Sequence, residues 1–145
     1  MQKKIRVHVI GKQIYPEGHE DLQESTAEGM YYERNGDFYV VYKESGIGSE
    51  GMEGVTTFIS IKDGLVTLNR KGAIDFKQEF KTGELKRSIY TTGYGKLWLS
   101  VMPHKVETDL TVHGGRISLE YDLFVDNNLV SYNVLLLNIK EDLPL

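Results

Sequence analysis

Two charged residues, Glu44 and Arg70, occupy positions where the alternation of the chain predicts apolar side chains. Glu44 continues the apolar phase of residues 38–42, and Arg70 continues that of residues 66–68. Each lies at the end of its expected strand, and strand ends lie near the rims of a sheet or barrel. Because burying either charge alone costs several kcal/mol, we expect the two side chains to pair if both point inward.

This pair has two interpretations. As a structural feature, a salt bridge would hold two strands in register and close one end of the fold. As a functional feature, Arg70 would anchor an anionic ligand, because a guanidinium presents a fork of N–H donors, and Glu44 would hold that fork in place. Thr57, Gln78 and Thr108 also lie on apolar phases, so they are further candidates for lining the same cavity.

A glycine-rich stretch, residues 46–51, has the spacing G-x-G-x-x-G of a nucleotide-binding loop. Such a loop binds pyrophosphate when a helix follows it, whereas residues 55–59 have the pattern of a strand. Glu50 and Glu53 would also repel phosphate. We therefore interpret residues 45–54 as a connecting loop, of the kind that can cover a barrel mouth.

The other residues that could do chemistry form no constellation. The histidines at positions 8, 19, 104 and 113 have no metal-ligand spacing, and the chain contains no cysteine. It has no G-x-S-x-G nucleophile elbow and no serine, histidine and aspartate in a supporting context. The sequence therefore predicts no metal, no cofactor and no catalytic residue, and it favours a non-enzymatic protein.

Length and composition predict one ordinary globular domain, residues 1–145. The chain is 40% hydrophobic and 26% charged, which suits a domain that buries its own core. Its formal net charge of −4 provides no basic surface for nucleic acid. Residues 5–9 alternate instead of forming the apolar run of a signal peptide, and no segment reaches membrane-spanning length. We expect a cytoplasmic protein without a membrane partner.

The elements that must position these residues are strands. The clearest is the hairpin from Gly115 to Lys140, in which alternating apolar residues flank a turn at residues 126–128. Other tight-turn sequences separate similar segments: Asn35-Gly36, Asp63-Gly64 and Thr82-Gly83. We expect two irregularities, namely a bend or bulge at Gly11, where the apolar phase changes, and a strand end at Pro103.

The number and spacing of the strands predict the fold class. About ten short strands, spaced by roughly 8–12 residues, imply an antiparallel meander. No segment keeps an apolar period of about 3.6 over three turns, so we expect almost no helix. Because closure removes the exposed sheet edges, we predict an all-β fold, a closed antiparallel up-and-down β-barrel of about eight to ten strands. The same alternation also fits a two-sheet sandwich.

Short polar and aromatic motifs are spread over nearly the whole chain. They are Gln13, Glu28-Gly29, Tyr42-Lys43-Glu44, Thr56-Thr57, Arg70-Lys71-Gly72, Tyr90-Thr91-Thr92 and Tyr94-Gly95, followed by an alternating strand and a hairpin with Tyr121. In order and spacing this set resembles the DUF1934 family of small bacterial proteins. The resemblance implies a calycin-like, lipocalin-type β-barrel from a Firmicutes-like bacterium. It implies no reaction and no ligand, since the family is of unknown function, but it adds Tyr42 and Tyr90 to the candidate site.

Two function hypotheses follow. The first is a non-enzymatic module that binds a small anionic or amphipathic ligand at one barrel mouth, with these candidate residues: Tyr42, Glu44, Thr57, Arg70, Gln78 and Tyr90. The second is a structural or protein-interaction barrel with a filled lumen, as a monomer or a homodimer. Trp98 lies out of phase with its apolar neighbours, so it either faces outward, as the candidate interface residue for the second hypothesis, or lies buried under a crossing segment.

Overall fold

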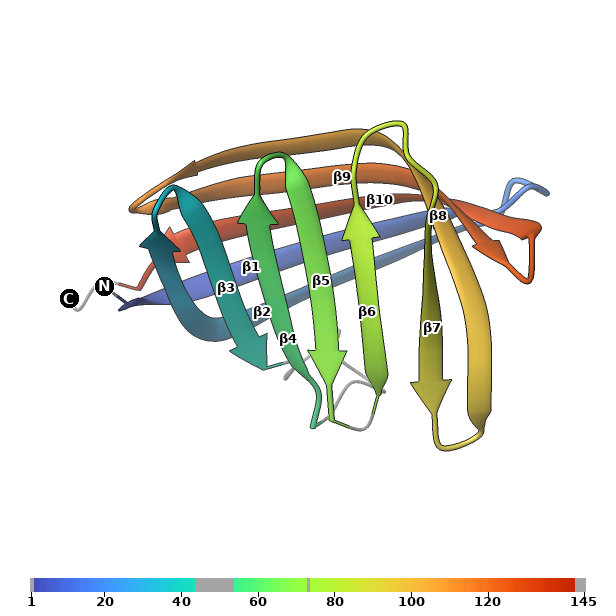
Figure 1. The fold of residues 1–145 in the computed structure, drawn as a ribbon, viewed down its shortest axis with the longest axis horizontal. Coiled ribbons are helices and arrows are strands. Elements are labelled where there is room, and N and C mark those ends of the chain that lie inside the picture. The colour runs from blue at the N-terminus through green and yellow to red at the C-terminus, as the bar shows by residue number, and fades with distance from the viewer. Residues whose placement is uncertain (1, 44–53, 73, 143–145) are drawn as a thin grey trace.

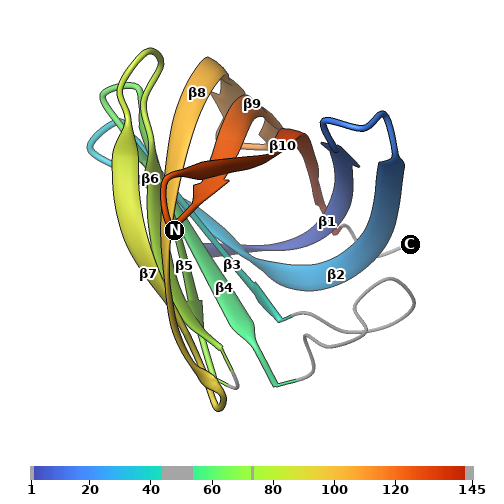
Figure 2. The same cartoon turned by 90° about the vertical axis from the view of Figure 1, so that its right-hand side faces the viewer.

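Ten β-strands form a closed barrel in the computed structural model, which describes residues 2–43, 54–72 and 74–142. The strands are β1 (Gln2–Ile14), β2 (Glu20–Arg34), β3 (Asp37–Lys43), β4 (Thr56–Lys62), β5 (Leu65–Lys71), β6 (Asp75–Phe80), β7 (Lys86–Thr92), β8 (Gly95–Thr111), β9 (Gly114–Val125) and β10 (Asn128–Glu141). Each pairs antiparallel with its neighbours in the chain, and β1 pairs with β10 to close the ring (Figure 1, Figure 2). The predicted all-β barrel is confirmed. No helix long and apolar enough to span a membrane occurs in the described residues.

The barrel combines strands of two lengths. β3 to β7 have six or seven residues each, whereas β1, β2, β8, β9 and β10 have 12 to 17. Figure 1 shows the long strands running across the short ones. The lumen is therefore enclosed between a wall of long strands and a wall of short strands.

Local turn chemistry explains how consecutive strands pair. Asn35 and Gly36 have φ values of 54° and 85°, and Asp126 and Asn127 have φ values of 49° and 68°. Positive φ at both central residues defines a type I′ turn, whose twist matches that of the flanking strands. Asn128, which we expected to belong to the turn, is instead the first residue of β10.

Gly11 does not interrupt β1. The strand keeps its register with both β2 and β10 from Ile5 to Ile14, so the predicted bulge is wrong. The lumen-facing phase that starts with the buried Ile5 and Val7 continues through Gly11 and Gln13, which line a cavity. The apolar phase ends at Gly11 because the lumen changes from packed core to open cavity at this level.

Pro103 lies inside β8 and does not end a strand. The two strands that we expected before and after it form one strand of 17 residues. Proline cannot donate to a strand ladder, and the pairing of β8 with β9 is irregular between Pro103 and Lys105. The carbonyl of Pro103 still accepts a hydrogen bond from the N–H of Gly83 at 2.9 Å. The irregularity thus accommodates the proline without breaking the strand.

The core fills one end of the lumen. Its most buried members are Ile5, Val7, Val40, Val66, Ile117, Leu119, Leu137 and Ile139. Tyr31, 1% exposed, donates a hydrogen bond to the carbonyl of Thr111 at 2.6 Å. This bond joins β2 to β8, which are not neighbours in the barrel, and burial raises the pKa of Tyr31 to about 12. Packing and a bond across the lumen therefore close this end.

One seam of the barrel depends on a side chain. β6 and β7 have only two register pairs, both at the N-terminal end of β6. Farther along, the Gln78 amide donates to the carbonyls of Glu79 and Lys86 at 2.9 and 3.3 Å. Its oxygen accepts a hydrogen bond from the Ser88 hydroxyl at 2.7 Å. A buried glutamine thus takes the place of missing ladder bonds between the two strands.

Candidate ligand-binding site

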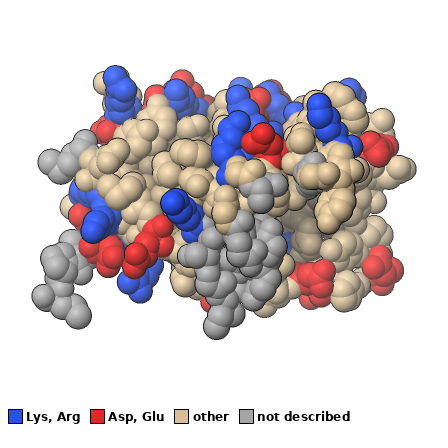
Figure 3. Space-filling view, turned by 90° about the horizontal axis from the view of Figure 1, so that it is seen from below, with Lys and Arg blue, Asp and Glu red and all other residues tan. Residues whose placement is uncertain are grey.

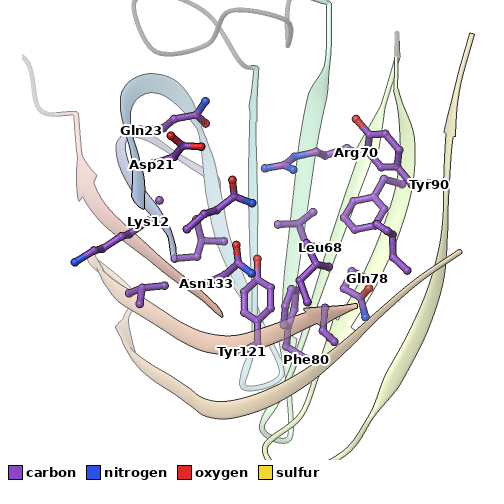
Figure 4. Close-up of a pocket in the computed structure, with 18 residues that line it drawn as sticks. Lys12, Asp21, Gln23, Leu68, Arg70, Gln78, Phe80, Tyr90, Tyr121 and Asn133 are labelled. Carbon is purple, nitrogen blue, oxygen red and sulfur yellow. The ribbon is translucent and has the colours of Figure 1, made fainter. Parts of the chain in front are cut away.

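A cavity of about 320 Å³ occupies the other end of the lumen (Figure 4). Both walls of the barrel contribute to it, and most of its lining surface is apolar. Its volume lies near the lower limit of about 300 Å³ for small-molecule pockets.

Register pairing places four of the candidate residues in a single row that crosses five strands. This row, which we call the arginine row, runs across β3 to β7 through Tyr42, Thr57, Arg70, Phe76 and Tyr90. Register partners point to the same face of a sheet, with Cβ atoms about 5 Å apart. Four of these five residues were candidates from the sequence, but only the register shows that they are neighbours.

The arginine row has a buried half and a half that meets the cavity. Tyr42 and Thr57 are 2% and 0% exposed and lie outside the cavity lining, whereas Arg70 and Tyr90 line the cavity. The Arg70 side chain extends from β5 into the cavity (Figure 4). Glu44 lies outside the described residues, so its pairing with Arg70 stays a prediction.

The remaining candidates have different positions. Gln78 lines the cavity, but both ends of its amide are hydrogen-bonded at the seam, so it supports the cavity wall. Thr108 is exposed on β8 and is absent from the lining. Trp98 is 58% exposed, which agrees with the outward orientation expected from its phase. Its register partner on β7 is Ile89.

A second polar row faces the cavity from the long strands. This row, which we call the amide row, runs across β2, β1, β10 and β9 through Asp21, Gln13, Asn133 and Tyr121. All four residues line the cavity. We did not identify Asp21 or Asn133 from the sequence. A signal was present, because the inward phase of β10 is apolar at Leu135 and Leu137 and turns polar at Asn133.

Hydrogen bonds within the amide row orient its groups. The Asn133 amide nitrogen donates to the hydroxyl and carbonyl of Ser131 at 2.9 and 3.3 Å, which leaves its carbonyl oxygen as an acceptor. The Tyr15 hydroxyl lies 3.0 Å from the Gln13 carbonyl oxygen and 3.1 Å from a carboxylate oxygen of Asp21, so it links these two members of the row. Burial raises the pKa of Tyr121, although the positive charge of Arg70 opposes this effect. The Tyr121 hydroxyl is therefore protonated at neutral pH.

Charged groups at the rim beside the amide row are paired. The ammonium of Lys12 lies 3.5 Å from a Glu20 carboxylate oxygen. The His19 ring nitrogen Nε2 lies 3.1 Å from a carboxylate oxygen of Asp21. The wall of short strands thus carries the guanidinium of Arg70, and the opposite wall carries the Asp21 carboxylate together with neutral hydrogen-bonding groups.

Charged side chains of both signs are mixed on one face of the barrel. Lysines and arginines are interspersed with aspartates and glutamates on the face drawn in Figure 3. The described residues include no group of three or more histidine, aspartate or glutamate side chains that could hold a metal ion. Each histidine instead contacts one carboxylate: His8 with Glu24, His19 with Asp21, His104 with Asp122, and His113 with Glu141.

The fold and this site define a closed, ten-stranded β-barrel with a polar and apolar cavity at one mouth. The crystal structure of the ywiB protein from Bacillus subtilis has the same fold, with a TM-score of 0.86 and 25% identity over 98% of this chain and 94% of that chain. The uncharacterized beta-barrel protein YwiB of Bacillus subtilis (strain 168) is 30% identical over 113 residues, which are 77% of this chain and 76% of that protein. The model of DUF1934, a domain of unknown function, matches residues 7–137. The chain therefore belongs to the DUF1934 family, as its motifs implied.

Several of the motifs that resemble the DUF1934 family lie in the two lumen-facing rows. Gly29 is the register partner of Tyr42 and extends the arginine row onto β2. Gln13 and Tyr121 belong to the amide row. Motifs that are far apart in the sequence thus meet around one lumen.

Proposed function

We propose that this protein is a non-enzymatic binding module that takes a small amphipathic anion in the cavity at the barrel mouth. The observation that carries this proposal is the Arg70 guanidinium, which extends into a cavity with a mostly apolar lining (Figure 4). A carboxylate would accept charge-assisted hydrogen bonds from the guanidinium fork. The apolar part of the ligand would contact side chains such as Leu68, Leu99 and Leu123, which line the same cavity.

The surroundings of Arg70 favour an anion over a neutral or cationic molecule. Neighbouring rings and aliphatic side chains displace water from this wall, and electrostatic interactions are stronger where water is displaced. Lys12 also lines the cavity, but Glu20 offsets its charge. Binding at Arg70 would therefore place the anionic end of the ligand against the wall of short strands.

We expect octanoate to bind more tightly than octanol or octylamine when all three are measured by isothermal titration calorimetry. Arg70→Gln should weaken octanoate binding roughly ten- to hundredfold, because hydrogen bonds to charged groups contribute about 1.5–3 kcal/mol, and should leave octanol binding unchanged. Arg116→Gln, at an exposed arginine of β9, is the matched control. Similar affinities for octanoate and octanol, or similar effects of the two arginine substitutions, would contradict the proposal.

A protein-interaction role is the second candidate function. Trp98 and its register partner Ile89 are 58% and 39% exposed on the outer face of β7 and β8, and exposed aromatic side chains of this kind are enriched at interfaces. We expect sedimentation velocity to show a concentration-dependent dimer that Trp98→Ser dissociates, if this surface serves self-association. A protein that stays monomeric at every concentration would contradict a role of this surface in self-association.

A further inference from the structure

The amide row gives the cavity a second recognition wall opposite Arg70. Two of its groups face the cavity with hydrogen-bonding capacity left: the Asn133 carbonyl oxygen and the Tyr121 hydroxyl. Starting from the proposed function, we propose that the ligand is a small aromatic carboxylate with a hydroxyl group at the end opposite its carboxylate.

Aromatic side chains shape the cavity for a flat ring. The rings of Phe76 and Tyr90 pack edge to face beside Arg70, with centroids 5.4 Å apart. Phe80 and Tyr121 pack at 5.0 Å with a 59° tilt, and this contact crosses the lumen because β6 and β9 are not neighbours. All four rings line the cavity. Aromatic pairs prefer such edge-to-face and tilted contacts to a face-to-face sandwich, so a ligand ring can continue the existing arrangement.

The amide row matches a hydroxyl better than a charged group. Asn133 and Tyr121 are register partners on β10 and β9, so one ligand hydroxyl can donate to the Asn133 oxygen and accept from the Tyr121 hydroxyl. A second carboxylate would approach Asp21, which has the same charge. An ammonium would compete with His19 for that aspartate. An apolar end would displace water from Asn133 and Tyr121 and would offer these two polar groups no hydrogen bond in return.

The cavity volume sets the size of the ligand. About 320 Å³ suits a single ring with a short acid side chain, because it lies near the lower limit of about 300 Å³ for small-molecule pockets. The arginine row lies on the short strands and the amide row on the long strands (Figure 4), so a ligand that contacts both rows must carry its two polar groups at opposite ends.

Two probes that differ only in the hydroxyl group test the contribution of the amide row: 4-hydroxyphenylacetate and phenylacetate. In calorimetric titrations of the full chain, we expect 4-hydroxyphenylacetate to bind roughly three- to tenfold more tightly than phenylacetate, which corresponds to the net effect of one or two neutral hydrogen bonds. Tyr121→Phe should bring this ratio close to one, because it removes the hydroxyl and keeps the ring. Tyr132→Phe is the control, because Tyr132 hydrogen-bonds Glu120 on the outer face of the same hairpin.

The outcomes distinguish this inference from the proposed function. Equal binding of the two aromatic acids to the unmodified protein would overturn the inference, and that comparison needs no variant. The inference would also be overturned if the Tyr121→Phe variant no longer bound either acid, or if both acids bound the unmodified protein more weakly than octanoate does. In each case the proposed function stands if octanoate binding still depends on Arg70. If Arg70→Gln leaves the affinity for every carboxylate unchanged, the proposed function fails as well.

Discussion

Gly29→Ala is expected to lower the free energy of unfolding by roughly 3 kcal/mol or more. A Cβ atom at Gly29 would lie 2.2 Å from the carbonyl oxygen of Val41 and 2.9 Å from the Cβ of Tyr42. Both are parts of β3 that a side-chain rotation cannot move away. Gly29 is also the residue at which β2 begins to pair with β3, so relief of the clash would separate two strands of the closed barrel.

Gly11→Ala is the matched control for this prediction. Gly11 also lies on the inward face of a long strand, but the nearest atom to its added Cβ is the Leu135 Cδ1 at 3.9 Å, which is an ordinary contact. Replacing a glycine without strain stabilises a protein by about 0.4–1 kcal/mol through the unfolded state, so we expect no loss of stability. Urea unfolding of both variants measures the difference. Similar midpoints for Gly29→Ala and Gly11→Ala would show that β3 can move aside.

The effect of Gly29 also extends to the site. Tyr42 and Gly29 are register partners, and Tyr42 begins the arginine row that ends at the cavity. An alanine that displaces Tyr42 should therefore disturb Arg70 through the intervening Thr57, which is completely buried. The glycine thus positions binding residues that it does not touch.

Strands and turns could be predicted from the sequence because their causes are local. The Asn35-Gly36 pair can adopt positive φ at both positions, so the turn and the two flanking strands follow from a few adjacent residues. Closure was predicted from the cost of exposed edges. The bulge expected at Gly11 and the strand end expected at Pro103 were wrong because both depend on the neighbouring strands: the register of β10 and β2 continues past Gly11, and β9 adapts to Pro103.

The candidate site was only partly visible in the sequence. Arg70 was conspicuous because a charge on an apolar phase is rare, and it lines the cavity. Asn133 was inconspicuous because a single polar residue in a strand is common. Its importance comes from a register that joins it to Tyr121 and Gln13, and those residues are far from it in the sequence. Such a row exists only once the barrel has closed.

Tyr31→Phe is expected to lower the free energy of unfolding by roughly 1–2 kcal/mol near neutral pH, because the part-buried hydrogen bond between Tyr31 and the Thr111 carbonyl is lost. The effect should depend on pH. The pKa of Tyr31 is raised to about 12, above the value of about 10 in an unfolded chain, so the native state holds this proton more tightly. The stabilisation is therefore complete below about pH 10 and is lost as the pH rises through 12.

Urea unfolding at neutral pH and at several values between pH 10 and 12 tests this dependence. The stability of the unmodified protein should fall toward that of Tyr31→Phe and then below it, because an ionised Tyr31 would be buried without compensation. Tyr132, whose pKa a hydrogen bond to Glu120 raises to about 12, should show a smaller dependence, since solvent screens its more exposed position. A constant difference between the unmodified protein and Tyr31→Phe across this range would show that the closed end admits water and that the Tyr31 hydroxyl is not held in a sealed core.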